Sequence, residues 1–142
     1  MTLTAAAAQT IIAATLAEGR AKAMKPLAIA VLDERGALKA FMAEDGTSLK
    51  RGAIAQGKAN GAIALGVGSR AIGKMAAERP HFIAAATPAV GGLIPVAGGV
   101  LIRDAQDRVI GAVGVSGDTS DNDEIAAMAG IAAAGLKSDP GA

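Results

Sequence analysis

The stretch that decides the fold is residues 91–124, GGLIPVAGGVLIRDAQDRVIGAVGVSGDTSDNDE. It contains two apolar runs of strand length, 100–104 and 109–115, which are separated by the polar turn 105–108. Two such runs joined by a short polar turn predict a β-hairpin. The second run passes into the glycine-rich loop 114–117 and then into an acidic helix start. A hairpin beside such a loop and a helix N-terminus is a natural place for a small ligand.

An acidic cluster follows the hairpin. The spacing Ser120-x-x-Asp123 matches a capping box and predicts a last helix over 121–136, after which 138–142 is expected to be a frayed tail. Acids in a first helical turn mainly cap the helix and compensate its dipole. One of them, Glu124, is also a candidate general base beside the glycine loop.

The sequence before this stretch indicates a helix, a hairpin and two further helices. Apolar residues at helical spacing indicate the helices, whereas short apolar runs bounded by turn residues indicate the strands. Pro80 is expected to stop the third helix and to leave 81–92 irregular. The expected ranges are a helix over 5–24, strands over 27–33 and 38–43, a helix from Thr47 or Ser48 to Leu65, and a helix over 70–79 that Ser69 caps.

These elements follow the order α-β-β-α-α-β-β-α. Strands that come in hairpins favour an antiparallel sheet with helices on its faces over a parallel, doubly wound sheet. At 142 residues the chain is expected to form one domain over 1–142. The fold class predicted from the pattern is therefore α/β of the α+β kind.

Composition excludes several classes of function. A net charge of +1 without a basic run argues against nucleic-acid binding, and the absence of cysteine excludes disulfides and cysteine metal sites. A single histidine leaves too few ligands for a metal site made by protein alone. The uncharged segment 82–102 is interrupted by proline and glycine, so we expect no membrane span. With no cationic leader at its start, the chain is expected to be cytoplasmic.

The core is expected to be made of small side chains. The chain is rich in alanine and contains 19 glycines but only two aromatic residues, Phe41 and Phe82. Small side chains bury little apolar area each. We therefore expect a homo-oligomer, in which subunit interfaces add to the buried area.

Cations on the second helix suggest a site for a small anion. Lys50 and Arg51 lie at its start, where acids are the usual residues, and Lys58 lies two turns further on the same face. Arg51 is the candidate carboxylate clamp. Lys58 has two interpretations: it extends along apolar neighbours to solvent, or it contacts the ligand as an acid/base or electrostatic group.

His81 is the only imidazole of the chain. In the loop expected after Pro80, it is either a solvated surface residue, an axial ligand for haem iron, or a general acid/base.

The chain also resembles a known family over nearly its whole length. The residues that carry the resemblance are IAVLD at 29–33, Gly36, Asp45-Gly46, Ile54-Ala55, Lys58-Ala59, GGL at 91–93 with Pro95, GGV at 98–100, GAVGVSG at 111–117 and Asp123-Glu124. With them the chain resembles the GlcG/HbpS-type haem-binding family, which also includes the C-terminal domain of PduO-type proteins.

The resemblance implies a profilin-like or PAS-like fold and homo-oligomers that are built from dimers and reach octamers. It also implies binding of haem or a corrinoid in some members and a link to glycolate oxidation in others. This chain departs from the haem-binding pattern, because its first helix and first hairpin contain no histidine. Relatives often carry a serine and an acid where this chain has Arg51 and Ala53. These departures favour a small anion as the ligand.

Two functional classes follow. The first is a small-ligand pocket protein that binds haem or a small anionic metabolite. The second is a cofactor-independent enzyme of the lyase, hydrolase or tautomerase class that acts on a carboxylated metabolite. Its catalytic residues would be Lys58, Arg51 and Glu124. In either class, the expected ligand-binding residues are Asp45, Gly98, Gly99, Ser116, Gly117 and His81.

Overall fold

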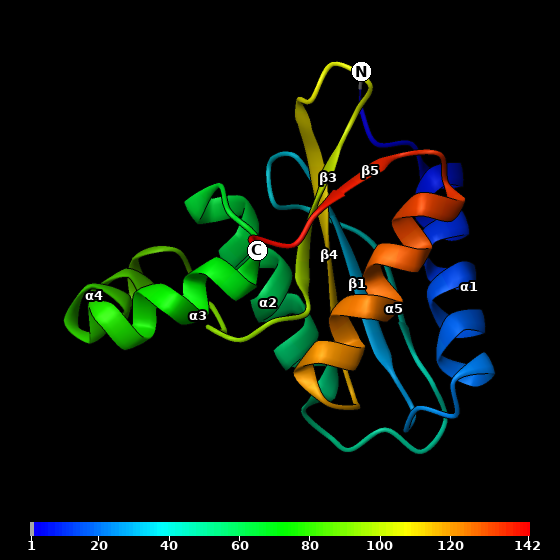
Figure 1. Ribbon diagram of the computed structural model, residues 1–142, viewed down its shortest axis with the longest axis horizontal. Coiled ribbons are helices and arrows are strands. Elements are labelled where there is room, and N and C mark those ends of the chain that lie inside the picture. The colour runs from blue at the N-terminus through cyan, green and yellow to red at the C-terminus, as the bar shows by residue number, and fades with distance from the viewer. Residues whose placement is uncertain (1) are drawn as a thin grey trace.

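The computed structural model describes residues 2–142, which form one five-stranded antiparallel sheet flanked by helices (Figure 1). The strand order across the sheet is β2-β1-β4-β3-β5. The elements are α1 (Ala5–Ala21), β1 (Ala28–Asp33), β2 (Leu38–Ala43), α2 (Arg51–Leu65), α3 (Ser69–Glu78), α4 (Pro80–Ala89), β3 (Gly99–Arg103), β4 (Val109–Ser116), α5 (Ser120–Ala133) and β5 (Lys137–Asp139). The predicted fold class and both predicted hairpins are confirmed.

The helices cover the two faces of the sheet unequally. Helices α1 and α5 pack against each other on one face, whereas α2 alone packs on the other face (Figure 1). Helices α3 and α4 extend outward from the α2 side. The three-layer arrangement places the N-terminus of α2, the end of β4 and the start of α5 at the same end of the sheet, at the bottom of Figure 1.

Strand β1 carries large side chains on the face that α1 and α5 cover and small ones on the face that α2 covers. Ile29 and Val31 belong to the large apolar cluster beneath α1 and α5, whereas Ala28 and Ala30 on the opposite face pack with Ala55 of α2. Alternate residues of a strand point to opposite faces, so large side chains face two helices and small ones face the other. The alanine face lets α2 approach the sheet closely.

Glycine makes that approach closer still. A Cβ on Gly114 of β4 would lie 1.8 Å from the carbonyl oxygen of Ala55. No side chain fits at such a distance, so α2 packs directly on the backbone of the central strand. The face of α2 that carries Ala55 and Ala59 therefore lies against the sheet.

Two elements were not expected from the sequence. Pro80 begins α4 instead of leaving 81–92 irregular, because proline has the φ angle of a first helical turn and lacks only an N–H that needs no partner there. The prediction that 138–142 forms a frayed tail is partly wrong as well. Lys137–Asp139 pairs with β3 as the edge strand β5. An ion pair of 2.9 Å between Arg103 and Asp139 stabilises that pairing.

The helix starts also differ from the predicted caps. Thr119, not Ser120, caps α5 by accepting a hydrogen bond of 3.2 Å from the N–H of Asn122. Gly68 precedes α3, so Ser69 is its first residue. Lys50 stands at the cap position of α2 and makes no side-chain cap hydrogen bond. The α2 N-terminus therefore has neither the serine or threonine cap that was predicted nor an acid in its first turn.

The uncharged segment 82–102 is divided among α4, a loop and β3. Within residues 2–142, none of the helices is both long enough and apolar enough to cross a membrane.

Candidate functional site

The central feature of the site is a buried lysine. Lys58 projects from α2 past the start of β3, and its side chain is 2% exposed. The ammonium Nζ donates to the carbonyl oxygen of Val115 at 2.9 Å and to Oδ2 of Asp123 at 3.1 Å. The interpretation in which Lys58 extends to solvent is wrong, because Asp123 and Val115 provide partners inside the protein. The other interpretation, that Lys58 contacts the ligand, stays a prediction.

Asp123 completes the buried pair from the other side of the sheet. It lies in the first turn of α5, its side chain is 2% exposed, and its Oδ1 accepts the N–H of Asp118 at 2.9 Å. Burial lowers the pKa of Lys58, while the charge and hydrogen bond of Asp123 act in the opposite direction. Asp123 is therefore an ion-pair partner that joins α2 to α5, not the capping-box residue that was predicted.

Gly98 and Gly99 enclose the lysine. A Cβ on Gly98 would lie 2.7 Å from Nζ of Lys58, and one on Gly99 would lie 2.3 Å from the lysine carbonyl oxygen. The φ of Gly98 is +121°, a conformation that favours glycine. The N–H of Gly99 donates to Oγ of Ser69 at 2.7 Å. Both glycines serve close packing here, and their predicted role in ligand binding stays a prediction.

Arg51 lies at the same end of the sheet but reaches the surface. Its guanidinium is half-buried and donates to Oγ of Ser116 at 3.3 Å. In the described residues, 2–142, no carboxylate lies within ion-pair distance of it. It lines a recess of about 210 Å³, which we call the Arg51 recess. The residues that line it are Lys25, Pro26, Gly46, Thr47, Ser48, Arg51 and Gly117.

Asp118 follows Gly117 and holds Lys25, and both of these residues line the recess. Its carboxylate accepts the N–H of Lys25 at 2.8 Å, the amide of Asn122 at 2.8 Å and the N–H of Thr119 at 2.9 Å. These hydrogen bonds lower the pKa of Asp118 to about 2, with the Lys25 N–H as the largest cause. Asp118 is therefore ionised at neutral pH and holds the chain that leads into β1.

The structure brings some of the predicted site residues together and separates others. Six of the nine lie around the end of β4: Arg51, Lys58, Gly98, Gly99, Ser116 and Gly117. The remaining three lie apart from them. Glu124 accepts from Nε of Arg70 at 3.0 Å, Asp45 lines a separate hollow with Arg20 and Glu44, and His81 is exposed in the first turn of α4.

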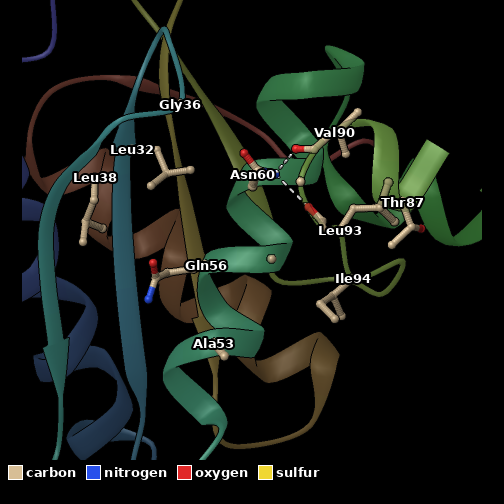
Figure 2. A pocket seen from close by; sticks show the side chains of 13 residues that line it. Leu32, Gly36, Leu38, Ala53, Gln56, Asn60, Thr87, Val90, Leu93 and Ile94 are labelled. Atoms are coloured by element: carbon tan, nitrogen blue, oxygen red, sulfur yellow. Dashed lines mark hydrogen bonds between the residues drawn. The ribbon is translucent and has the colours of Figure 1, made fainter.

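A second, wider hollow was not predicted from the sequence. It has a volume of about 760 Å³, and we call it the α2 cleft. Figure 2 shows α2 as its floor, the turn and strands of the β1–β2 hairpin on one side, and the end of α4 with the following loop on the other. Its lining residues are Leu32, Gly36, Leu38, Ala53, Gln56, Gly57, Asn60, Thr87, Val90, Gly91, Gly92, Leu93 and Ile94.

Asn60 fixes one wall of the α2 cleft. Its Nδ2 donates to the carbonyl oxygens of Val90 at 2.9 Å and Gly92 at 2.7 Å, which ties the loop after α4 to α2 (Figure 2). The signal in the sequence was a pair of amides four residues apart on one face of α2, Gln56 and Asn60, with the glycine pair Gly91-Gly92 later in the chain.

The donor atoms that bind haem iron are not found in the α2 cleft. None of its 13 lining residues is a histidine, methionine, cysteine, tyrosine or lysine. His81, Met42 and Met75 lie instead on α4, β2 and α3. Across residues 2–142, no group of three or more His, Asp or Glu side chains is placed to hold a metal ion.

Comparisons with known proteins give a family and a set of similar folds. The crystal structure of a PduOC:haem complex matches with a TM-score of 0.84 at 18% identity, over 96% of this chain and 97% of that one. The Klebsiella pneumoniae protein ORFY matches with a TM-score of 0.83 at 27% identity, over 95% and 92%. The crystal structure of HbpS matches with a TM-score of 0.81 at 25% identity, over 93% and 89%. A comparison with curated protein sequences gives no match.

These neighbours confirm the expected fold, and the first of them, at 18% identity, supports the fold alone. The sequence match is more specific, because the family model described as haem degrading protein HbpS-like aligns with residues 3–132. That range includes β1, α2, the second hairpin and nearly all of α5. The chain therefore belongs to the HbpS-like family.

Proposed function

We propose that this protein binds a small carboxylate in the Arg51 recess. The observation that carries the proposal is the half-buried guanidinium of Arg51, which lines a recess and has no acidic partner within residues 2–142. Arginines that are partly withdrawn from water normally pair with a carboxylate or phosphate, since the planar guanidinium offers two parallel donors to such groups.

The surroundings of Arg51 favour an anion in two further ways. The recess is also lined by Lys25 and by the hydroxyl residues Thr47 and Ser48. The first turn of α2, which Arg51 begins, contains no acid and has no side-chain cap. The positive end of the helix dipole is therefore uncompensated by the protein itself.

The size of the recess limits the ligand. A volume of about 210 Å³ lies below the range of roughly 300–1,000 Å³ that is usual for sites of drug-sized molecules. We infer a compact carboxylate of a few carbon atoms. Its carboxylate would bind Arg51, and its remaining polar groups would bind the hydroxyls of Thr47 and Ser48.

Lys58 supports this site without contacting the ligand. Its ammonium is buried and is bound to Asp123 and Val115. Val115 directly precedes Ser116, which accepts a hydrogen bond from Arg51. Lys58 therefore holds in place the end of β4 that Arg51 contacts. Its role in the proposal is that of a positioning residue, and no catalytic step is assigned to it.

Haem does not fit the hollows of this chain. The description of the family refers to haem, and the PduOC structure is that of a haem complex. The α2 cleft offers no side chain that would ligate the iron, and the Arg51 recess has less than a third of the volume of the cleft. The proposed ligand is therefore a small carboxylate and not haem.

Isothermal titration calorimetry with acetate, propionate and lactate tests the proposal, with acetamide as the uncharged comparison. A charge-assisted hydrogen bond is worth about 1.5–3 kcal/mol, so Arg51→Gln is expected to weaken carboxylate binding about 10- to 100-fold. Arg51→Lys is expected to restore part of the affinity, because it keeps the charge but loses the two parallel donors. Arg35→Gln in the exposed turn after β1 is the matched control.

Equal affinity of the parent and Arg51→Gln for each of these carboxylates would refute the proposal. The same conclusion would follow if no carboxylate bound better than acetamide. Circular dichroism of each variant checks that the fold is intact.

A further inference from the structure

We propose that the α2 cleft is a second ligand site, which binds an uncharged, mainly apolar small molecule that carries a hydrogen-bond donor. The site differs from the Arg51 recess in its residues, its size and its electrostatics. The proposal does not depend on carboxylate binding at Arg51.

The dimensions of the cleft suit a small organic molecule. Its volume of about 760 Å³ falls within the range of about 300–1,000 Å³ that is typical of ligand sites. Leu32 and Leu38 from the hairpin lie on one side of the α2 floor, and Leu93 and Ile94 lie on the other (Figure 2). Gly57 of α2 makes room for this second side, since a Cβ there would lie 2.7 Å from Cγ1 of Ile94.

The absence of ionisable groups sets the charge of the ligand. None of the 13 lining residues has a side chain that titrates. Moving a charged group out of water without an oppositely charged partner is costly. A carboxylate or an ammonium ion would therefore lose hydration in the cleft without compensation, whereas a neutral molecule would not.

Asn60 supplies a fixed hydrogen-bond acceptor. Its Nδ2 donates to two backbone carbonyls, of Val90 and Gly92, and a flipped amide would place an oxygen against both of them. The oxygen Oδ1 is therefore held on the hairpin side, 3.7 Å from the position a Cβ would take on Gly36. No donor within residues 2–142 hydrogen-bonds to it. A ligand N–H or O–H would complete this amide.

Gln56 adds an adaptable polar group one turn earlier on α2. Its side chain is exposed, makes no hydrogen bond within the described part of the chain, and lies on the hairpin side of the cleft in Figure 2. Its amide both donates and accepts, so it adds to the binding of a neutral polar group without selecting a charge. An apolar wall with two amides on one side is the arrangement that would orient a planar amide or alcohol.

Two probes of nearly equal shape test the proposal: 4-bromobenzamide, which is neutral, and 4-bromobenzoate, which is anionic. Crystals of the parent protein are soaked with each, and the anomalous signal of bromine locates the probe. Calorimetry then gives the affinities in solution. We expect 4-bromobenzamide in the α2 cleft, with its amide N–H near Oδ1 of Asn60, and at least tenfold weaker binding of 4-bromobenzoate there.

Variants separate this site from the Arg51 recess. Ala53→Trp fills the cleft from an exposed helix position and is expected to weaken 4-bromobenzamide binding at least tenfold, while propionate binding is unchanged. Ala13→Trp, at an exposed position of α1 on the other face of the sheet, is the matched control. Arg51→Gln is expected to weaken propionate binding only.

Bromine density outside the cleft, or equal binding of both probes in it, would overturn the proposal. So would undiminished binding of 4-bromobenzamide by Ala53→Trp. If Ala53→Trp lowers the mass of the assembly in light scattering and the parent binds no probe in the cleft, a second copy of the chain covers this surface and the proposal is wrong. Should Ala53→Trp fail to fold, the probe positions in the parent crystals still decide the question.

Discussion

Replacing Lys58 with methionine tests whether the buried ion pair holds the two layers of helices together. Methionine has nearly the length of lysine but cannot donate to Asp123 or Val115. The carboxylate of Asp123, 2% exposed, would keep only the N–H of Asp118 as a partner. Lys58→Met is therefore expected to leave an uncompensated charge inside the protein.

The size of the effect follows from the burial of both partners. Removing one member of a buried pair typically costs about 3–5 kcal/mol of unfolding free energy, most of which is the desolvation of the charge that remains. In a chain of this length, such a loss lowers the melting temperature by about 10–15 °C. By contrast, the pair of Lys22 with Glu18 involves a lysine side chain that is 55% exposed. Lys22→Met should cost less than about 1 kcal/mol.

Denaturant unfolding, followed by circular dichroism at 222 nm, measures these free energies for the parent and for four variants. The four are Lys58→Met, Asp123→Asn, the double variant and Lys22→Met. The asparagine side chain in Asp123→Asn would still accept the N–H of Asp118 but carries no charge. The double variant is therefore expected to be more stable than Lys58→Met by about 1–3 kcal/mol, the signature of a coupled pair. A loss below about 1 kcal/mol in Lys58→Met, or strictly additive losses in the double variant, would refute this account.

Three further predictions follow from the structure. The carboxylate of Asp118, whose pKa falls from its ordinary 3.8 to about 2 on folding, stabilises the protein above pH 3.8. The melting-temperature difference between the parent and Asp118→Asn should therefore shrink as pH falls from 3.8 towards 2, and a constant difference would contradict this. Titration with hemin should give no stoichiometric Soret band, because no ligating side chain lines the α2 cleft; a tight complex that His81→Ala abolishes would show otherwise. Light scattering at micromolar concentration should give an oligomer, since Phe41 and Met42 are 40% and 47% exposed along the edge strand β2, and a monomer would contradict this.

The part of the fold that the sequence predicted correctly rests on strong periodic patterns. The run at 27–33 was expected to be a strand, and it forms β1, which lies between β2 and β4. The turns after Asp33 and Asp104 also follow from local sequence. Each aspartate accepts backbone N–H groups within its own turn, which is a common role of aspartate in turns. Such patterns are local, so no knowledge of the tertiary structure is needed to interpret them.

The elements that the sequence did not predict depend on tertiary contacts. Helix α4 begins with proline and contains Pro88, so its sequence carries two signals that usually mark an interruption. Strand β5, with the sequence KSD, has no apolar alternation and is stabilised by pairing with β3 and by Arg103. The environment of Lys58 depends on Asp123, which lies 65 residues away in the sequence. Spacing along a helix indicates which face a side chain occupies but not which group meets it there.

The residues that carry the family resemblance explain why it predicted the fold. Gly114 admits the carbonyl of Ala55, Gly99 admits that of Lys58, and the lysine in turn binds Asp123. These are contacts between α2, the central hairpin and α5, so a chain that keeps them keeps the architecture whatever it binds. Glycines of that set, such as Gly36 and Gly117, line the two hollows as backbone, whereas the polar side chains there do not belong to it. These side chains are Arg51 in one hollow and Gln56 and Asn60 in the other. Ligand choice can therefore change within this fold through side chains on the outward part of α2, while the buried lysine and its glycines stay fixed.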